Sequence, residues 1–308
     1  MATALSTSAN GQPEPDDRSA AYRVLVDHVR TGRCILFLGA GVHYAPPGES
    51  RFSYPREQRP PLGCELATEL AAECDFARVC PHDEPTNLQR VALCYEKEVS
   101  RGQLVERIRT SVEGTTQPSA AVRALAELPF SLIITTNYDT LFERAQRRAD
   151  KDPLVAAFDP NGDVATRDYP HGRDPTERQP FVFKVHGDVN APESIVVTDE
   201  DYISFVLRMN AADRFHPIPQ TFRYQFARWP TLFVGYSLLD YNLRLLFRTL
   251  RWKVDAAQHP DSYSVDLQPD PLISDRWQRE QGFRFIAQDV WDFVPRLYSE
   301  VLDREMPA

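Results

Sequence analysis

Four short apolar runs in this chain stop abruptly at small or polar residues. The runs cover 34–38 (CILFL), 132–136 (LIITT), 181–185 (FVFKV) and 231–234 (TLFV), and they end at GAG, NYD, HGD and GYS. Short apolar runs bounded by turn residues are typical of strands that are buried on both faces of a parallel sheet. Ligands of open α/β sheets bind beyond the carboxyl ends of the strands. We therefore expect the four terminal motifs to converge on one pocket.

The segments between these runs alternate strands with helices. Apolar residues at helical spacing predict helices at 20–30, 63–74, 88–111, 119–128, 140–148, 201–209, 221–229, 239–252 and 291–302, with further short strands at 194–197 and 283–287. The segment 150–179 is dense in Asp, Pro, Gly and Arg and is expected to be a loop. This alternation predicts an α/β fold with a Rossmann-like, doubly wound parallel sheet. The helices at about 51–128 contain no clear strand between them, which predicts a mostly helical insertion.

Composition limits the compartment and the partners. Residues 1–17 are small, polar and Pro-containing, which predicts a disordered tail ahead of one domain at 18–308. They lack the apolar core of a signal peptide, and no stretch approaches the roughly 18 uncharged apolar residues needed to span a bilayer. We therefore expect a cytoplasmic protein. The net charge of −9 disfavours a broad electrostatic grip on nucleic acid.

The five cysteines, Cys34, Cys64, Cys74, Cys80 and Cys94, are odd in number and irregular in spacing. This pattern fits neither a disulfide framework nor a CxxC…CxxC zinc ribbon. Cys64, Cys74 and Cys80 could in principle share a metal, but ordinary reduced thiols account for them more simply. We expect no bound metal.

The glycine motif Gly39-Ala40-Gly41 has two interpretations. In the functional one, the backbone approaches a pyrophosphate closely and offers its amides to the anion. In the structural one, the motif is only a tight turn between a strand and a helix. The motif lacks the third glycine of the dinucleotide fingerprint, so taken alone it favours the tight turn.

The polar residues after the second and third runs also have two interpretations. Asn137 could hold a ribose hydroxyl or a water, with Asp139 behind it to fix its orientation. Alternatively, Asp139 caps the helix that starts at Thr140 and Asn137 simply fits the turn; both roles can hold at once for Asp139. His186 is either a structural histidine in a turn or a general base.

The fourth motif, Gly235-Tyr236-Ser237, also has a functional and a structural interpretation. Gly235 allows a close approach of the backbone, and the Ser237 hydroxyl can bond a phosphate or a ribose. Asp240 and Asn242 follow in the same segment. Asp240 could equally cap the next helix, and Asn242 could face water.

The order of these motifs resembles the sirtuin superfamily, and the match runs from about Ile35 to Asn242. The resemblance equates 39–41 with the opening phosphate loop of the family and 235–237 with its late glycine-serine turn. It equates Asn137 and Asp139 with the second motif, and His186 with the histidine of the catalytic histidine-glycine pair. Four motifs in the same order, each at a strand end, make a specific pattern.

The chain departs from the deacylase sirtuins at three places. It has VHYAPPGESR at 42–51 where those enzymes carry Ile-Pro-Asp-Phe-Arg, and Thr136 where they carry glutamine. No cysteine follows Cys94, so their four-cysteine zinc ribbon is missing. The stretches PLGCELATEL, TTNYD and GYSLLDYNLR resemble instead a bacterial sirtuin-like branch that is associated with NAD-depleting anti-phage defence.

This resemblance implies an NAD glycohydrolase that produces nicotinamide and ADP-ribose. It implies catalytic roles for Asn137, His186 and Asp139. The residues expected to hold NAD are Gly39, Ala40, Gly41, Thr136, Asn137, Gly235, Tyr236, Ser237, Asp240 and Asn242. Two alternatives stay open: an NAD-dependent protein deacylase, and a non-catalytic module that senses NAD or ADP-ribose.

The resemblance also implies an effector of abortive infection. The chain shows no second recognisable domain that would sense infection, so we expect a homo-oligomer or a partner protein to supply the trigger. A translocase ATPase of the HerA–FtsK type is the first candidate partner. An Argonaute-like protein is the second.

Overall fold

The structure of the chain is a computed structural model that describes residues 15–160, 173–209, 218–236, 244, 247 and 260–308. Seven parallel strands form one sheet in the order β3-β4-β2-β1-β5-β6-β7. The strands are β1 (Ile35–Leu38), β2 (Leu132–Thr135), β3 (Leu154–Ala157), β4 (Phe181–Lys184), β5 (Thr231–Val234), β6 (Ser262–Val265) and β7 (Phe283–Ile286). From β1 the chain passes to β2, goes out to the edge strand β3, returns to β4 between β3 and β2, and then continues in β5 on the other side of β1. The order therefore reverses between β1 and β5, the place where sheets of this type bind ligands.

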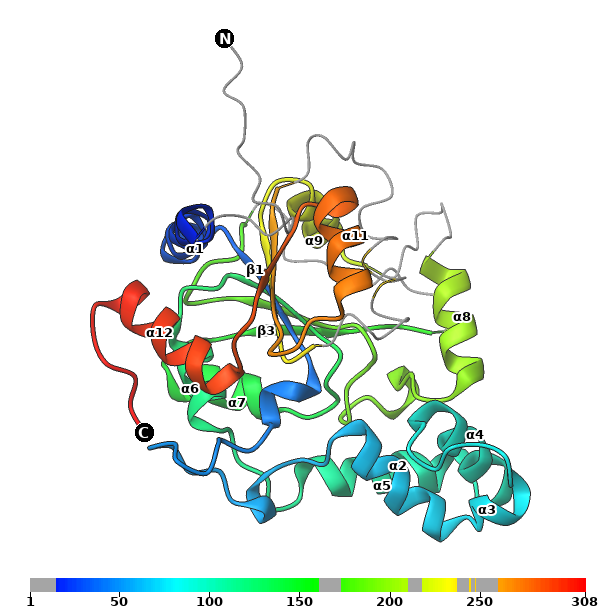
Figure 1. The fold of residues 1–308 in the computed structure, drawn as a ribbon. Coiled ribbons are helices and arrows are strands. Elements are labelled where there is room, and N and C mark those ends of the chain that lie inside the picture. Colours follow the sequence, from blue (N-terminus) through cyan, green and yellow to red (C-terminus); the bar gives the residue numbers. More distant parts are fainter. Residues whose placement is uncertain (1–14, 161–172, 210–217, 237–243, 245–246, 248–259) are drawn as a thin grey trace.

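Helices cover both faces of the sheet (Figure 1). The helices of the described residues are α1 (Pro15–Arg30), α2 (Gly63–Glu73), α3 (Phe76–Val79), α4 (Leu88–Glu98), α5 (Arg101–Glu113), α6 (Ala120–Glu127), α7 (Leu141–Arg148), α8 (Asp199–Met209), α9 (Gln220–Phe226), α11 (Pro271–Gln281) and α12 (Val290–Leu302). α1, α6, α7 and α12 pack on one face, and α8, α9 and α11 pack on the other. The predicted Rossmann-like, doubly wound fold is confirmed.

Successive side chains of the central strands enter two separate cores. In β1, Leu36 and Leu38 join the core beneath α1 and α12. Ile35 and Phe37 join the core beneath α9 and α11. Because both faces are buried, every residue of β1 is excluded from water, and this explains why the run is apolar without alternation.

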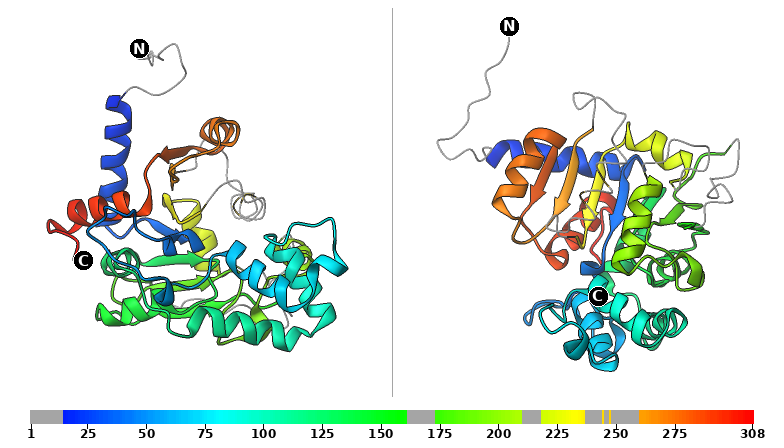
Figure 2. Two further views of the ribbon diagram at one scale, coloured as in Figure 1. Left: turned by 60° about the horizontal axis from the view of Figure 1, so that its bottom comes forward. Right: turned by 90° about the vertical axis from the view of Figure 1, so that its right-hand side faces the viewer.

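The helices that follow β1 fall into two parts. α2 to α5 share a third core, and they lie together below the sheet in Figure 1 and again in the right-hand view of Figure 2. α6 instead packs on the sheet, in the same core as α12. The limits of the helical insertion expected at about 51–128 stay a prediction.

Two strands lie in segments where no strand was predicted. β3 falls within the expected loop at 150–179; it is an edge strand, and its LVAA sequence is only partly buried. β6 has the polar sequence SYSV, yet all four of its residues are buried between β5 and β7. In both cases the strand depends on its neighbours in the sheet, which a local apolar pattern does not reveal.

The strand predicted at 194–197 was wrong. A 3₁₀ turn, η3 (Pro192–Ser194), covers its start. The amide of Val196 then donates to the His186 carbonyl at 2.9 Å, and the amide of Val197 donates to Asp201 Oδ2 at 2.9 Å. The segment is apolar because Ile195 and Val197 fill the core of α2 to α5, not because it pairs with a strand.

Two helix predictions differ clearly from the structure, and a third lies mostly outside the described residues. The helix predicted at 88–111 is two helices, because the Ser100 side chain accepts a hydrogen bond from the Gln103 amide and starts α5 there. α1 begins at Pro15, inside the tail predicted at 1–17. The helix predicted at 239–252 lies outside the described residues, apart from Arg244 and Phe247.

Candidate active site

The carboxyl ends of four strands lie level with one another. Leu38 at the end of β1 pairs with Thr135 of β2 and with Val234 of β5, and Thr135 pairs with Lys184 of β4. The four polar motifs follow these four residues in the sequence. The structure therefore brings them to one edge of the sheet, as the strand pattern predicts.

The two glycine motifs pack directly against each other. The Gly39 amide donates to the Val234 carbonyl at 3.0 Å, and the Gly41 amide donates to the Gly235 carbonyl at 2.9 Å. Gly235 has a φ of +77°, and a Cβ there would lie 2.3 Å from the Val42 nitrogen. The glycines thus permit two loops to touch. Since the amides of Gly39 and Gly41 are already bonded within the protein, neither can donate to a phosphate as well.

Tyr236 links the fourth motif to the second. Its hydroxyl donates to Thr136 Oγ1 at 2.6 Å, and it accepts from the Thr136 amide at 3.2 Å. Its ring packs edge-on against Phe37 and Phe233. Two residues that were predicted to hold NAD are thus held by each other. Ser237, Asp240 and Asn242, also predicted to hold NAD, lie outside the described residues.

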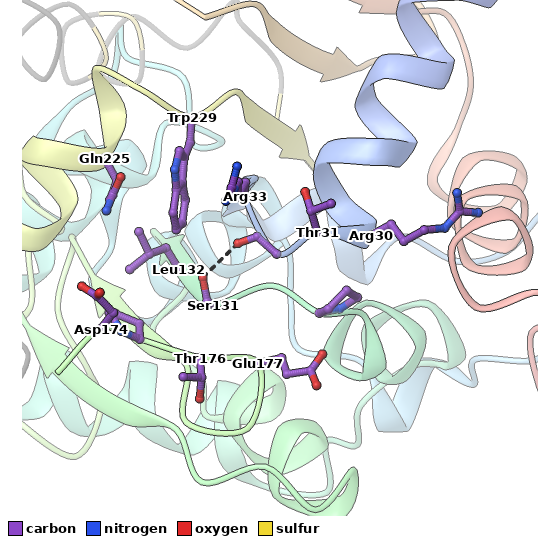
Figure 3. Close-up of a pocket in the computed structure, with 13 residues that line it drawn as sticks. Arg30, Thr31, Arg33, Ser131, Leu132, Asp174, Thr176, Glu177, Gln225 and Trp229 are labelled. Atoms are coloured by element: carbon purple, nitrogen blue, oxygen red, sulfur yellow. Dashed lines mark hydrogen bonds between the residues drawn. The ribbon is translucent and has the colours of Figure 1, made fainter.

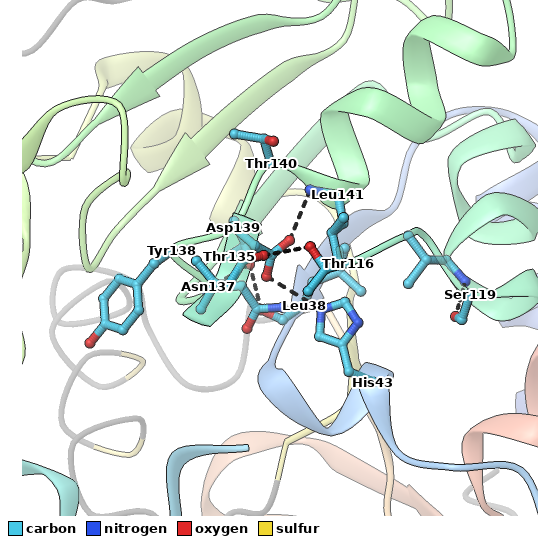
Figure 4. A network of polar contacts seen from close by, with 12 residues as sticks. Leu38, His43, Thr116, Ser119, Thr135, Asn137, Tyr138, Asp139, Thr140 and Leu141 are labelled. Carbon is cyan, nitrogen blue, oxygen red and sulfur yellow. Dashed lines mark hydrogen bonds and ion pairs between the residues drawn. The ribbon is translucent and has the colours of Figure 1, made fainter. Parts of the chain in front are cut away.

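Asn137 and Asp139 meet a histidine that the sequence analysis missed (Figure 4). His43 ends the 3₁₀ turn η1 (Ala40–His43), and it is only 4% exposed. Its Nε2 lies 3.4 Å from Asn137 Nδ2 and 3.4 Å from Asp139 Oδ2. The other carboxylate oxygen of Asp139 accepts from the Leu141 amide at 2.9 Å, at the start of α7. Asp139 therefore serves the helix start, as predicted, and reaches Asn137 through His43.

Lys184 is a second residue of the site that the sequence analysis missed. It is fully buried at the end of β4, with its ammonium 3.0 Å from Asp188 Oδ2 and 3.2 Å from Glu143 Oε1. The ammonium also donates to the carbonyls of Tyr138 and Asp139, at 3.0 and 2.6 Å. Burial alone would lower the pKa of Lys184, but the surrounding carboxylates hold this pKa above its usual value. The cation ties the turn after β2 to β4.

The same surroundings shift the pKa values of Asp139 and Glu143 in opposite directions. Burial would raise the pKa of Asp139, but His43 and Lys184 together hold it below its usual value. Burial raises the pKa of Glu143, and the Lys184 ammonium opposes this only in part. Of these two acids, Asp139 therefore carries a negative charge the more readily.

His186 lies in a different environment, against α8. Its ring packs edge-on against Tyr202 and Phe205, and its Nδ1 is 3.4 Å from the Tyr202 hydroxyl. Burial lowers the pKa of His186 to about 3, so the ring is neutral at physiological pH. Its Nε2 is buried and has no hydrogen-bond partner among the described residues. Within the same residues, no hydrogen bond joins His186 to Asn137.

The cavities of the structure differ in size and place. A cavity of about 10 Å³ lies beside Asn137, His43 and Asp139; this is about the room that one water needs. A cavity of about 350 Å³ lies at the amino ends of the strands, on the opposite edge of the sheet (Figure 3). It is lined by Arg30, Thr31, Gly32, Arg33, Pro129, Ser131, Leu132, Asp174, Pro175, Thr176, Glu177, Gln225 and Trp229. Because none of the four motifs reaches it, we place the candidate site at the carboxyl edge.

None of the five cysteines belongs to the four motifs at this edge. The sulfurs of Cys74 and Cys94 are 3.8 Å apart in the core of α2 to α5, and Cys64 is exposed. Across the described ranges, no group of three or more His, Cys, Asp or Glu residues is arranged to hold a metal ion. In that same part of the chain, every helix is too short or too polar to cross a membrane.

Comparison with known proteins matches residues 131–286 to the SIR2-like domain family. The chain is 26% identical to the NAD(+) hydrolase ThsA of Enterococcus faecium, over 79% of this chain and 45% of that protein. It is 27% identical to the NAD(+) hydrolase ThsA of Acinetobacter baumannii, over 91% of this chain and 55% of that protein. It is 25% identical to the Defense-associated sirtuin 2 of Bacillus subtilis, over 56% of this chain and 16% of that protein. The chain spans about half the length of the two ThsA relatives.

The contact between the two glycine loops predicts opposite effects for two Gly→Ala substitutions. Gly235→Ala should lower the free energy of unfolding by about 2 kcal/mol or more, because φ is positive and the new Cβ would strike Val42. Gly102→Ala should raise it by about 0.5 kcal/mol, because Gly102 is helical and has open space beside it. Urea unfolding of both variants measures the difference. A Gly235→Ala protein that unfolds at the wild-type urea concentration would contradict the packing described.

The buried His186 predicts a loss of stability in mild acid. The unfolded chain binds a proton at this residue below pH 6.5, whereas the folded chain does not until about pH 3. The free energy of unfolding should therefore fall by about 1.4 kcal/mol per pH unit between these limits, or about 2 kcal/mol by pH 5. His186→Phe should remove this dependence in urea titrations at pH 7 and pH 5. The exposed His82→Phe is the control, and equal pH slopes for wild type and His186→Phe would refute the prediction.

Proposed function

Because the chain belongs to the SIR2-like domain family, we propose that it is an NAD hydrolase that cleaves the bond between nicotinamide and ribose. The products are nicotinamide and ADP-ribose. Two relatives that match 79% and 91% of this chain are named NAD(+) hydrolase.

Two buried polar atoms at strand ends carry the proposal. Asn137 Oδ1 and His186 Nε2 are both shielded from water and lack a hydrogen-bond partner in the described part of the chain. Leaving such atoms unpaired costs about 1–3 kcal/mol each, and a ligand or a reaction is one reason for which a protein retains that cost. Both residues follow strands that are otherwise apolar. Hydroxyl groups of a ribose, or a water, would satisfy both atoms.

The reaction needs orientation more than it needs a strong nucleophile. Nicotinamide leaves as a neutral molecule and takes the bonding electron pair, while ribose C1′ takes on oxocarbenium character. The oxygen of a water then bonds to C1′ and releases its proton. Holding the ribose and the water in line supplies much of the rate. We assign this task to Asn137, whose turn is fixed by a 3.0 Å bond from its amide to Thr135 Oγ1.

His186 is our candidate for the group that receives the proton. A ring with a pKa of about 3 is a weak base, although its neutral Nε2 is free to accept a hydrogen bond from a ribose hydroxyl. The general-base role therefore requires substrate to raise this pKa. The two negative charges of the NAD pyrophosphate act in that direction.

We assign the pyrophosphate to the two glycine loops. The Ala40 amide is the donor left in the first loop, because the amides of Gly39 and Gly41 are bonded to β5 and its loop, and the described residues supply no acceptor for Ala40. Ala40 is exposed, unlike the glycines on either side of it. Ser237, Asp240 and Asn242 are assigned to the phosphates and the adjacent ribose on the resemblance of their motif alone.

We further propose that the protein is the effector of an anti-phage defence system that acts in the cytoplasm by depleting NAD. One relative carries the name Defense-associated sirtuin 2. Unrestrained loss of NAD would kill the host, so the activity must be triggered. We propose a homo-oligomer with a partner protein as the trigger, first a HerA–FtsK-type translocase ATPase and second an Argonaute-like protein.

Two substitutions test the reaction. Asn137→Ala and His186→Ala should each lower NAD cleavage by on the order of a hundredfold or more. Both proteins should remain folded, because neither side chain joins a strand ladder. Nicotinamide release, thermal melting and sizing should be measured together, with the exposed His82→Ala as the control. A folded His186→Ala protein that releases nicotinamide at nearly the wild-type rate would refute the proposed role.

Because we propose that a partner protein triggers the activity, we predict that the isolated chain turns over little NAD. Turnover should rise by an order of magnitude or more when the chain is assembled with the partner that co-purifies with it. Measuring NAD loss for the chain alone and for each assembly decides this. Rapid constitutive turnover by the chain alone, in host cells that grow normally, would contradict the prediction.

A further inference from the structure

His43 is a buried histidine with a polar group at each ring nitrogen. Figure 4 shows two of these neighbours, Asn137 and Asp139. Asp139 and Asn137 both lie 3.4 Å from its Nε2. On the other side of the ring, the Tyr54 hydroxyl lies 3.4 Å from its Nδ1. Tyr54 is itself buried, at 5% exposure. A ring enclosed to this degree must be satisfied by these three neighbours.

A doubly protonated ring satisfies these contacts together. The Tyr54 hydroxyl donates its hydrogen to the Gln117 carbonyl at 2.9 Å, so it can only accept from His43, and Nδ1 must carry a hydrogen. The Asp139 carboxylate is also an acceptor, so Nε2 must carry a hydrogen too. The imidazolium supplies both hydrogens, and the carboxylate balances its charge. A neutral ring leaves one of the two contacts without a hydrogen.

The charge on His43 also decides how the Asn137 carboxamide is turned. A protonated Nε2 and the amide Nδ2 are both donors, and two donors cannot bond to each other. A half-turn of the carboxamide exchanges Nδ2 with Oδ1, and Oδ1 then shares the Nε2 hydrogen with the Asp139 carboxylate. The NH₂ group then takes the buried position that has no partner in the described structure. In that position it is a donor in need of an acceptor.

We propose that His43 is a positioning residue for Asn137: anchored by Asp139 and Tyr54, it holds the carboxamide so that the NH₂ group donates to an oxygen of the substrate. The inference rests on the proposed function, because that oxygen is a ribose hydroxyl of NAD or the attacking water. Asp139 then orients Asn137 through His43 and not by direct contact. Tyr54 fixes the far side of the ring.

Tyr54→Phe tests this arrangement with little disturbance. The substitution removes the acceptor at Nδ1 and leaves His43, Asp139 and Asn137 in place. Tyr22→Phe is the matched control, because Tyr22 is 6% exposed in the same core and its hydroxyl has no partner among the described groups. His43→Gln is the second variant, since its single amide group can replace only one of the two ring donors.

The first measurement does not depend on activity. In NMR spectra of the ¹⁵N-labelled full chain, the Asn137 NH₂ signals are those lost in Asn137→Ala, and the His43 ring signals are those lost in His43→Gln. Both His43 nitrogens should carry hydrogens. The Asn137 signals should shift in Tyr54→Phe and His43→Gln but not in Tyr22→Phe. A ring with one N–H, or Asn137 signals that move in neither variant, overturns the proposal.

The second measurement is NAD cleavage by the same proteins, in the assembly that is active. Tyr54→Phe should lower kcat by about tenfold and leave KM nearly unchanged, because a displaced amide costs orientation in the transition state. Tyr22→Phe should match the wild type. A rise in KM alone, or a loss that follows the folded fraction, overturns the positioning role. If the wild type cleaves no NAD in any assembly while the Asn137 signals still respond, the proposed function fails. The role of His43 in positioning Asn137 for NAD falls with it, and only the contact between the two residues stands.

Discussion

The buried ammonium of Lys184 is the interaction on which the candidate site depends. A charge with no exposure to water must be surrounded by acceptors, or it would cost several kcal/mol to bury. Lys184 meets this need with two carboxylates and with two carbonyls from the turn after β2. The turn that carries Asn137 and Asp139 is therefore held to the strand that precedes His186. The polar residues stay in register with a sheet that is otherwise apolar.

The two halves of the site have opposite electrostatic characters. The half around Asn137 is polar and charged, with Asp139 placed between His43 and Lys184. The half around His186 is aromatic, and burial keeps that ring neutral. A molecule that carries both hydroxyl groups and a flat ring suits such a pair of surfaces. The half around Asn137 is therefore held by ion pairs and hydrogen bonds, and the half around His186 by aromatic packing.

The sequence predicted the fold well where burial follows from local pattern. The central strands are apolar on both faces, and their ends are punctuated by glycine or polar residues, so both the strands and their convergence could be read directly. β6 could not, because its serines are polar although the folded sheet buries them. The apolar run at 194–197 was wrongly predicted to be a strand. Its Ile195 and Val197 are buried by the helices α2 to α5, and none of the described strands pairs with it.

Asn137, Asp139 and His186 could be selected as site residues because they follow apolar runs. His43 could not, because it contacts Asn137 from 94 positions away in a loop of mixed composition. Lys184 was hidden inside an apolar run, where a lone lysine gives no local sign of the carboxylates it will meet. The sequence also could not show that the amides of Gly39 and Gly41 have partners within the protein. These amides bond to β5 and to the loop that follows it, so they cannot bind the phosphates as the sequence analysis expected. Partners that are distant in sequence set these contacts.

The most direct test of the account is the fate of NAD in water labelled with ¹⁸O. The full chain, in its active assembly, should release nicotinamide and ADP-ribose in equal amounts, and mass spectrometry should find one ¹⁸O in the ADP-ribose. That result shows that an oxygen from water replaces nicotinamide at the ribose carbon. Nicotinamide release that occurs only with an acyl-lysine peptide, and that yields acylated ADP-ribose, would contradict the account and identify the protein as a deacylase.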